Sequence, residues 1–169
     1  MNRREEAREL MERLAAEARS GGYLLNPDEE MVLDLMEGLL VNQQRYGYLA
    51  CPCRDADGER ELDLDIICPC DYRDADLDEH GACYCGLYVS EQVAAGEAAV
   101  HSIPERRPTP EQRAARRARQ SPDFGAGPFA GLGLPVWRCQ VCGYLCARPQ
   151  PPLKCPVCKA DKDRFERFA

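Results

Sequence analysis

The sequence predicts two small modules that fold around bound metal: a mainly α-helical N-terminal module whose loops wrap around a prosthetic group, and a small C-terminal metal-knuckle domain. Three observations predict this class. Two stretches with the apolar period of an α-helix open the chain, eleven cysteines occur in 169 residues, and ten of them form five close pairs. A segment rich in Pro, Arg and Gly separates the first three pairs from the last two.

Both helices are expected in the first 45 residues, where apolar side chains recur at i, i+3 and i+4 spacing. The first is predicted over residues 3–19 and the second over about 27–45. Asn26 is the predicted N-cap of the second helix, with Pro27 at its first position and Glu29 completing a capping box. The apolar positions are Ala7, Leu10, Met11, Leu14, Ala15, Ala18, Met31, Val32, Leu35, Met36, Leu39 and Leu40.

Three regions follow from the composition. Residues 1–103 form the N-terminal module, in which 51–85 lose the helical period and are expected to form turns and loops, and a short strand or turn after residue 86 closes the module. Residues 104–133 hold five prolines, six arginines and four glycines, cannot bury a core, and are predicted to be a linker with a short helix at 111–120. Residues 134–169 form the C-terminal domain.

Charge and hydropathy limit the partners and the compartment. The chain opens on charged residues, and no apolar run approaches the roughly 18 residues of a membrane span. We therefore expect a soluble, cytoplasmic protein, in which metal thiolates explain the cysteines better than a disulfide framework does. Residues 1–103 carry 23 acidic and 9 basic side chains, whereas the rest is basic, which predicts charge-steered docking either between the modules or onto a protein partner. The arginine cluster is too small beside so acidic a module to predict nucleic-acid binding.

The two pairs near the C-terminus are CxxC knuckles, Cys139 with Cys142 and Cys155 with Cys158. Each knuckle can present two thiolates to one tetrahedral ion. So short a domain cannot fold on apolar burial alone, so metal binding is expected to supply much of its folding energy. Spacing alone leaves a zinc ribbon and a rubredoxin-type iron site equally open.

The residues around the two knuckles favour the rubredoxin-type iron site over the zinc ribbon, by resemblance to a known family. WRCxxCGY at 137–144, PPxxCPxC at 151–158 and FExF at 165–168 resemble the short rubredoxin domains that end rubrerythrins. The resemblance implies one iron ion on the four knuckle thiolates, with zinc as the alternative. Cys146 lies outside this set and is predicted to be a packed thiol. The expected aromatic core consists of Trp137, Tyr144, Phe165 and Phe168.

The first three pairs are CPC at 51–53, CPC at 68–70 and CYC at 83–85. A 4Fe-4S cluster takes four thiolates, so six thiols would leave two beside it, which is what a disulfide-reducing centre needs. Zinc binding by the same pairs is the alternative that spacing leaves open.

The order and spacing of these pairs, behind two amphipathic helices, resemble the catalytic subunit of ferredoxin-thioredoxin reductase over residues 5–95. The resemblance implies a redox disulfide between Cys53 and Cys85, with Cys53 as the outer thiol that attacks the target. The 4Fe-4S ligands that it implies are Cys51, Cys68, Cys70 and Cys83.

One position departs from the family pattern. Plant-type members have His between the cysteines of the third pair, and this chain has Tyr84. Tyr is a poor proton acceptor at neutral pH, because its reference pKa is about 10. Either Tyr84 donates a hydrogen bond, or His80, Asp71 or another group handles protons, or the mechanism tolerates slower proton transfer.

The favoured hypothesis is a disulfide reductase. Ferredoxin or a similar low-potential donor, with or without the rubredoxin domain, would reduce the 4Fe-4S centre, and Cys53 and Cys85 would reduce a thioredoxin-like protein disulfide. The alternative is a non-catalytic electron-transfer or metal-binding adaptor, holding iron or zinc, in which all ten paired cysteines are structural.

Overall fold

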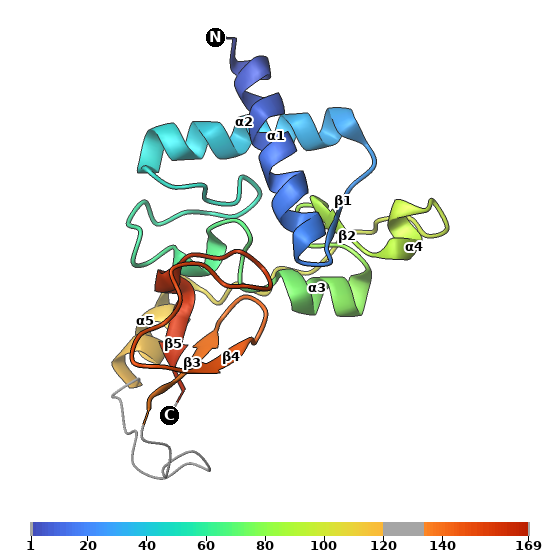
Figure 1. Cartoon of the computed structure of the whole chain (residues 1–169). Coiled ribbons are helices and arrows are strands. Elements are labelled where there is room, and N and C mark those ends of the chain that lie inside the picture. Colours follow the sequence, from blue (N-terminus) through green and yellow to red (C-terminus); the bar gives the residue numbers. More distant parts are fainter. Residues whose placement is uncertain (1, 120–133, 169) are drawn as a thin grey trace.

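The computed structural model describes residues 2–119 and 134–168 (Figure 1). Two long helices cross at one end of the molecule, and a loop-rich region joins them to a small C-terminal sheet (Figure 1). None of the helices described is both long and apolar enough to cross a bilayer. A helical N-terminal part and a small strand-containing C-terminal part are therefore present, as predicted.

The two predicted helices are confirmed as α1 (Arg3–Ser20) and α2 (Glu29–Tyr46). Asn2 caps α1 in a capping box with Glu5, whose side chain accepts from the Asn2 N–H. The facing stripes form the main core, because burial of an apolar stripe is what stabilises an amphipathic helix. Its buried members on the helices are Ala7, Leu10, Leu14, Ala18, Val32, Leu33, Met36 and Leu39.

The predicted N-cap of α2 is wrong by two residues. Asp28 is the N-cap, and its carboxylate accepts from the Met31 N–H at 3.1 Å. Asn26 lies too far ahead of the helix to reach its free N–H groups. Its side chain instead accepts from the Asp28 N–H at 3.0 Å and donates to the Gly86 carbonyl at 3.0 Å. Asn26 therefore ties the start of α2 to the loop of the third cysteine pair.

The region after α2 consists mainly of loops and short elements, as expected. A 3-10 turn η1 (Leu64–Ile66) and the short helix α3 (Arg73–His80) lie between the cysteine pairs. Strand β2 (Tyr88–Val89) pairs antiparallel with β1 (Leu24–Leu25), and the single turn α4 (Glu91–Ala94) follows. The sequence reasoning missed β1, because a two-residue strand is too short to show a period.

The segment predicted as a linker begins with residues that contact the N-terminal module. We call residues 104–113 the arginine segment. Its arginines bind carboxylates of the module: Arg106 reaches Asp76 at 2.6 Å, and Arg107 reaches Asp63 at 2.8 Å. The last part of this segment lies in helix α5 (Pro110–Arg119), close to the predicted short helix. Residues 120–133 lie outside the described residues. The linker boundaries themselves stay a prediction.

Asp63 is the centre of this contact and is fully buried. Its carboxylate accepts from the Tyr48 hydroxyl at 2.6 Å, from the Asp57 and Gly58 N–H groups at 2.9 Å, and from Arg107. Burial opposes ionisation of Asp63, but these hydrogen bonds outweigh it and hold the pKa below its usual value. Asp63 therefore fixes the loop around residue 57 and the arginine segment together.

Replacing Asp63 with Asn should lower the free energy of unfolding by about 1.5–3 kcal/mol, because the change removes the buried charge that accepts hydrogen bonds from Tyr48, from two N–H groups and from Arg107. Urea unfolding followed anaerobically by circular dichroism measures the change. Asp55→Asn, an exposed carboxylate in the same loop, is the matched control and should change stability by less than about 0.5 kcal/mol.

Comparison of the wild type with Asp63→Asn at different pH values gives a second test of Asp63. A carboxyl group whose pKa is lower in the folded state stabilises the fold above its unfolded pKa of about 3.9, and this stabilisation is lost as the pH falls through the folded pKa. The difference in stability between wild type and Asp63→Asn should therefore be full at neutral pH and shrink below about pH 4. An unchanged difference at low pH would contradict this account of Asp63.

The C-terminal domain is a three-stranded antiparallel sheet with β3 (Val136–Cys139) in the centre. Its neighbours are β4 (Leu145–Ala147) and β5 (Phe165–Arg167), and the 3-10 turn η2 (Lys162–Arg164) leads into β5. Of the predicted aromatic core, Phe165 is buried and Trp137 and Tyr144 pack against it. Phe168 is 45% exposed, so its place in that core was wrong. It lies at the end of β5, where Arg138 covers its ring.

Candidate functional site

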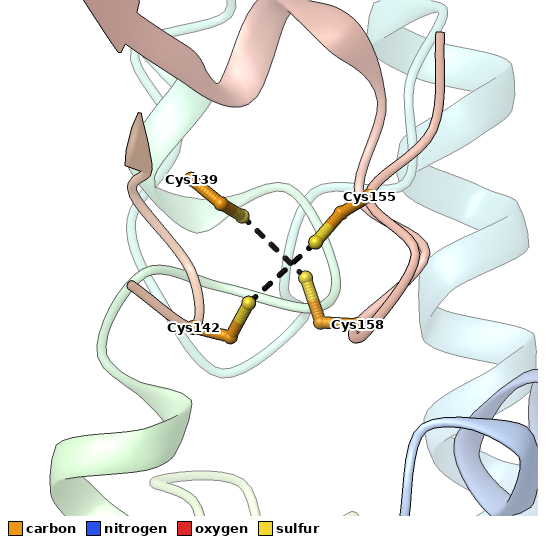
Figure 2. Close-up of side chains that lie close together, drawn as sticks. All are labelled: Cys139, Cys142, Cys155 and Cys158. Carbon is orange, nitrogen blue, oxygen red and sulfur yellow. Dashed lines mark hydrogen bonds between the residues drawn. The ribbon is translucent and has the colours of Figure 1, made fainter. Parts of the chain in front are cut away.

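The four knuckle cysteines converge in the C-terminal domain (Figure 2). Cys139 ends β3, Cys142 follows in the turn, and Cys155 and Cys158 come from the loop before β5. The Sγ atoms of Cys139 and Cys158 are 3.6 Å apart, as are those of Cys142 and Cys155. Within the described parts of the chain, this is the one group of three or more potential ligands whose donor atoms all lie within 4.8 Å of one another.

This spacing fits one tetrahedral ion. Metal–sulfur bonds of about 2.3 Å place the sulfurs of a tetrahedron about 3.8 Å apart, close to the measured contacts. The Cys158 thiol and the N–H groups of Val141 and Cys142 lower the pKa of Cys139 and so favour its thiolate. Gly143, with a φ of 74°, makes the tight turn after the first knuckle. The thiolate set suits iron or zinc.

Cys146 lies on β4 and packs against the domain core, outside the four-sulfur group. The thiol is half-buried. This agrees with its prediction as a packed thiol.

The six N-terminal cysteines come from three loops that the fold brings together. An isolated bridge between Ala50 and Ile67 joins the first two loops, and beside it the Cys51 N–H donates to the Ile66 carbonyl at 2.8 Å. The third loop is held by β2, where the Tyr88 N–H donates to the Cys83 sulfur at 3.2 Å. Pairs that are up to thirty residues apart in sequence therefore face one region of the module.

The contacts between these thiols separate an outer sulfur from inner ones. Cys53 is exposed, whereas Cys51, Cys70 and Cys83 are buried. Hydrogen bonds to the Cys51 and Cys85 thiols lower the pKa of Cys53. Cys85 in turn lies 3.6 Å from the Cys83 sulfur. Cys85 thus lies beside a buried thiol and also acts on the exposed one.

Burial raises the pKa of Cys68 and of Cys70, and the neighbouring thiols add to this effect. Two buried arginines oppose it: Arg73 acts on Cys68 and Arg54 acts on Cys70. Buried thiols of this kind become thiolates when a positively charged metal centre replaces the proton. The donor set and its burial therefore fit a thiolate-bound cluster.

Tyr84, at the position where plant-type relatives have His, lies against Arg54. The Arg54 guanidinium carbon is 4.4 Å from the centre of the Tyr84 ring and 4.7 Å from that of Tyr72. The Arg54 side chain is fully buried and also pairs with Asp76 at 3.4 Å. The Tyr84 ring therefore stacks on the guanidinium of Arg54, the residue that directly follows Cys53.

The other two candidates for proton handling, His80 and Asp71, have ion-pair partners of their own. His80 ends α3, with its Nε2 3.9 Å from Glu79. Asp71 is held by an ion pair with Arg164 of the C-terminal domain, and burial raises its pKa to about 6 although Arg164 acts in the opposite direction. The choice among these groups stays a prediction.

Sequence reasoning missed the buried arginines around the sites, Arg54, Arg73 and Arg164. The guanidinium carbon of Arg73 is 3.5 Å from the centre of the Tyr23 ring. Nothing in the local sequence distinguishes these arginines from surface ones. Arg73 pairs with the adjacent Asp74, but its ring contact with Tyr23 and the partners of Arg54 and Arg164 come from distant segments, so the fold itself is the signal.

Three CxC pairs gathered behind two helices, followed by a four-cysteine knuckle that suits a metal ion, define a cysteine-rich protein of two modules. Two family models match the chain: Ferredoxin thioredoxin reductase catalytic beta chain at residues 1–106, and Rubrerythrin, rubredoxin-like domain at residues 137–166. The chain therefore belongs to the ferredoxin thioredoxin reductase catalytic beta chain family and carries a C-terminal rubredoxin-like domain. A comparison with curated proteins gives no significant match. Both predicted resemblances are confirmed.

Proposed function

We propose that this protein is a disulfide reductase that takes electrons from ferredoxin or a similar low-potential donor and reduces a thioredoxin-like protein disulfide. Membership of the family implies a disulfide-reducing oxidoreductase. The observation that carries the finer proposal is the order of thiols in the N-terminal module. Cys53 is exposed and the less exposed Cys85 thiol lowers its pKa, while the Cys85 sulfur lies 3.6 Å from that of the buried Cys83.

In this proposal four of the thiols hold a 4Fe-4S cluster, and Cys53 and Cys85 form the redox disulfide. The ligands are Cys51, Cys68, Cys70 and Cys83. When bound, the cluster supplies electrons one at a time, whereas reduction of a disulfide takes two electrons and two protons. Cys85 is the less exposed member of the pair and lies 3.6 Å from the sulfur of the ligand Cys83, so we assign it to the cluster side.

Cys53 is the attacking thiol because it is the one that a protein target can reach. Its thiolate forms a bond to one target sulfur while the target's disulfide breaks, and the leaving sulfur takes up a proton. Cys85 then attacks Cys53, which releases the second target sulfur as a thiol and restores the Cys53–Cys85 disulfide. The Cys85 thiol is near enough to lower the pKa of Cys53, which supports this second step.

Metal analysis and disulfide mapping of the anaerobically purified protein test the proposal. We expect a brown protein with about five iron atoms per chain, four in the cluster and one in the knuckle. Before reduction, mass spectrometry should find a bridge between positions 53 and 85. A colourless, zinc-loaded protein without that bridge would support the metal-binding adaptor instead.

A further inference from the structure

The C-terminal domain lies against the loop of the second cysteine pair. Arg60 of the N-terminal module pairs with Asp163, and Tyr23 packs against the core of the C-terminal domain. The backbones also meet closely: a Cβ atom on Gly21 would lie 2.3 Å from the Val157 carbonyl oxygen. Glycine at position 21 is thus required by the fit between the two modules.

Arg164 is the most buried residue of this contact, with 2% of its surface exposed. Its guanidinium donates to the Ile67 carbonyl at 2.9 Å and pairs with the Asp71 carboxylate. Ile67 directly precedes Cys68 and Asp71 directly follows Cys70. The Arg164 side chain therefore binds a residue at each end of the second CPC loop.

The backbone of Arg164 holds the other metal site. Its carbonyl accepts from the Gln140 N–H at 2.9 Å, and Gln140 directly follows the knuckle ligand Cys139. The next residue, Phe165, is the register partner of Cys139 in the sheet. Arg164 therefore joins the two metal-binding loops through three hydrogen bonds, two from its side chain and one to its carbonyl.

We propose that Arg164 is a positioning residue that fixes the rubredoxin-like site against the Cys68–Cys70 loop, so that the C-terminal domain is the built-in electron carrier of the disulfide site. This inference rests on the proposed function. Each transfer oxidises one ferrous ion at the knuckle to ferric and adds one electron to the N-terminal centre. Two transfers with two protons convert the Cys53–Cys85 disulfide to two thiols, and an external one-electron donor restores the ferrous ion after each transfer.

Burial and geometry separate this role from that of an ordinary surface ion pair. Surface pairs contribute little and hold no fixed orientation. Arg164 is buried and its planar guanidinium has two partners, which is the arrangement in which arginine fixes orientation and lysine cannot replace it. Loss of the Arg164 guanidinium should let the two metal-binding loops move relative to each other, while each metal site keeps its own ligands.

The test compares Arg164→Met with Arg138→Met, which removes a half-exposed guanidinium from β3 of the same domain. Both iron-loaded, oxidised proteins should keep the wild-type metal content and visible spectra. A photoreductant then delivers one electron to the knuckle, and absorbance follows its passage to the N-terminal centre. We expect at least about tenfold slower passage in Arg164→Met and no more than about twofold change in Arg138→Met. Equal rates in all three proteins would overturn the proposal.

Asp71→Asn keeps the Ile67 hydrogen bond and removes the charge partner, so it tests the same contact if Arg164→Met fails to fold. Its passage rate should fall between those of wild type and Arg164→Met, and a wild-type rate would contradict the proposed role. A small chemical reductant that reaches the N-terminal centre directly keeps the two proposals apart. With it, Arg164→Met should reduce a protein disulfide as fast as wild type, whereas failure of every variant, wild type included, would sink the proposed function.

Discussion

Cys53→Ser is expected to abolish reduction of a protein disulfide while the protein keeps its full iron content. Cys53 is the exposed member of the N-terminal thiols, and the Cys85 thiol lowers its pKa, so its loss removes the nucleophile and not a ligand in our assignment. A serine hydroxyl at this position cannot form the mixed disulfide. Loss of a nucleophile typically costs at least about 10³-fold in turnover. Donor-driven turnover with a thioredoxin-like substrate, alongside iron analysis, measures both effects.

Two further variants sharpen this test. Cys146→Ser removes a half-buried thiol that belongs to neither site, and it should leave turnover and iron content unchanged. Cys85→Ser should accumulate a mixed disulfide between Cys53 and the target, because the resolving thiol is gone. Loss of iron in Cys53→Ser would show that Cys53 is a cluster ligand and that the pairing of thiols is wrong.

Removal of the metal from the knuckle is expected to unfold the C-terminal domain as a unit. Three of its six buried core residues are the ligands Cys139, Cys155 and Cys158, and Leu153 is 77% exposed, so apolar burial there is slight. Structural metal sites of this kind contribute about 10–16 kcal/mol of binding free energy, far more than this core can supply. Cys155→Ser should therefore abolish amide protection across β3 and β5, and hydrogen exchange with mass spectrometry measures it.

The N-terminal helices provide the internal reference for that experiment. Amides of α1 and α2 should stay protected in Cys155→Ser, because the buried residues of their core form a cluster distinct from the knuckle, although Tyr23 packs against both. Cys146→Ser serves again as the matched variant and should keep the exchange pattern of the wild type. Protected β3 amides in the metal-free domain would mean that the sheet folds without its ion.

The sequence predicted what local pattern encodes. Ala7, Leu10, Leu14 and Ala18 repeat at helical spacing, and α1 buries them as expected. The knuckle cysteines converge because each CxxC pair is short enough for one turn to present both sulfurs. The N-cap of α2 was misplaced because Asn26 and Asp28 are both good caps, and the Gly86 carbonyl, sixty residues away, engages Asn26.

Sequence reasoning could not find the buried arginines, because their partners lie far along the chain. Arg164 binds Ile67 and Asp71, nearly a hundred residues earlier, and Arg107 binds Asp63. Composition alone assigned the arginines of residues 104–113 to a solvated linker, since nothing local marks a charge that will be buried. The overall charge asymmetry did predict docking, and the ion pairs of Arg107 and Arg164 agree with that expectation.

The arginine segment also bears on how the catalytic module can be cut from its chain. The family match ends at residue 106, yet Arg107 and Arg113 still neutralise Asp57, and Arg107 neutralises the buried Asp63. A fragment that stops at the family boundary would carry these carboxylates without counter-charge, in a region that is already strongly acidic. We therefore expect a stable N-terminal fragment to extend at least to residue 113, beyond the end of the family match.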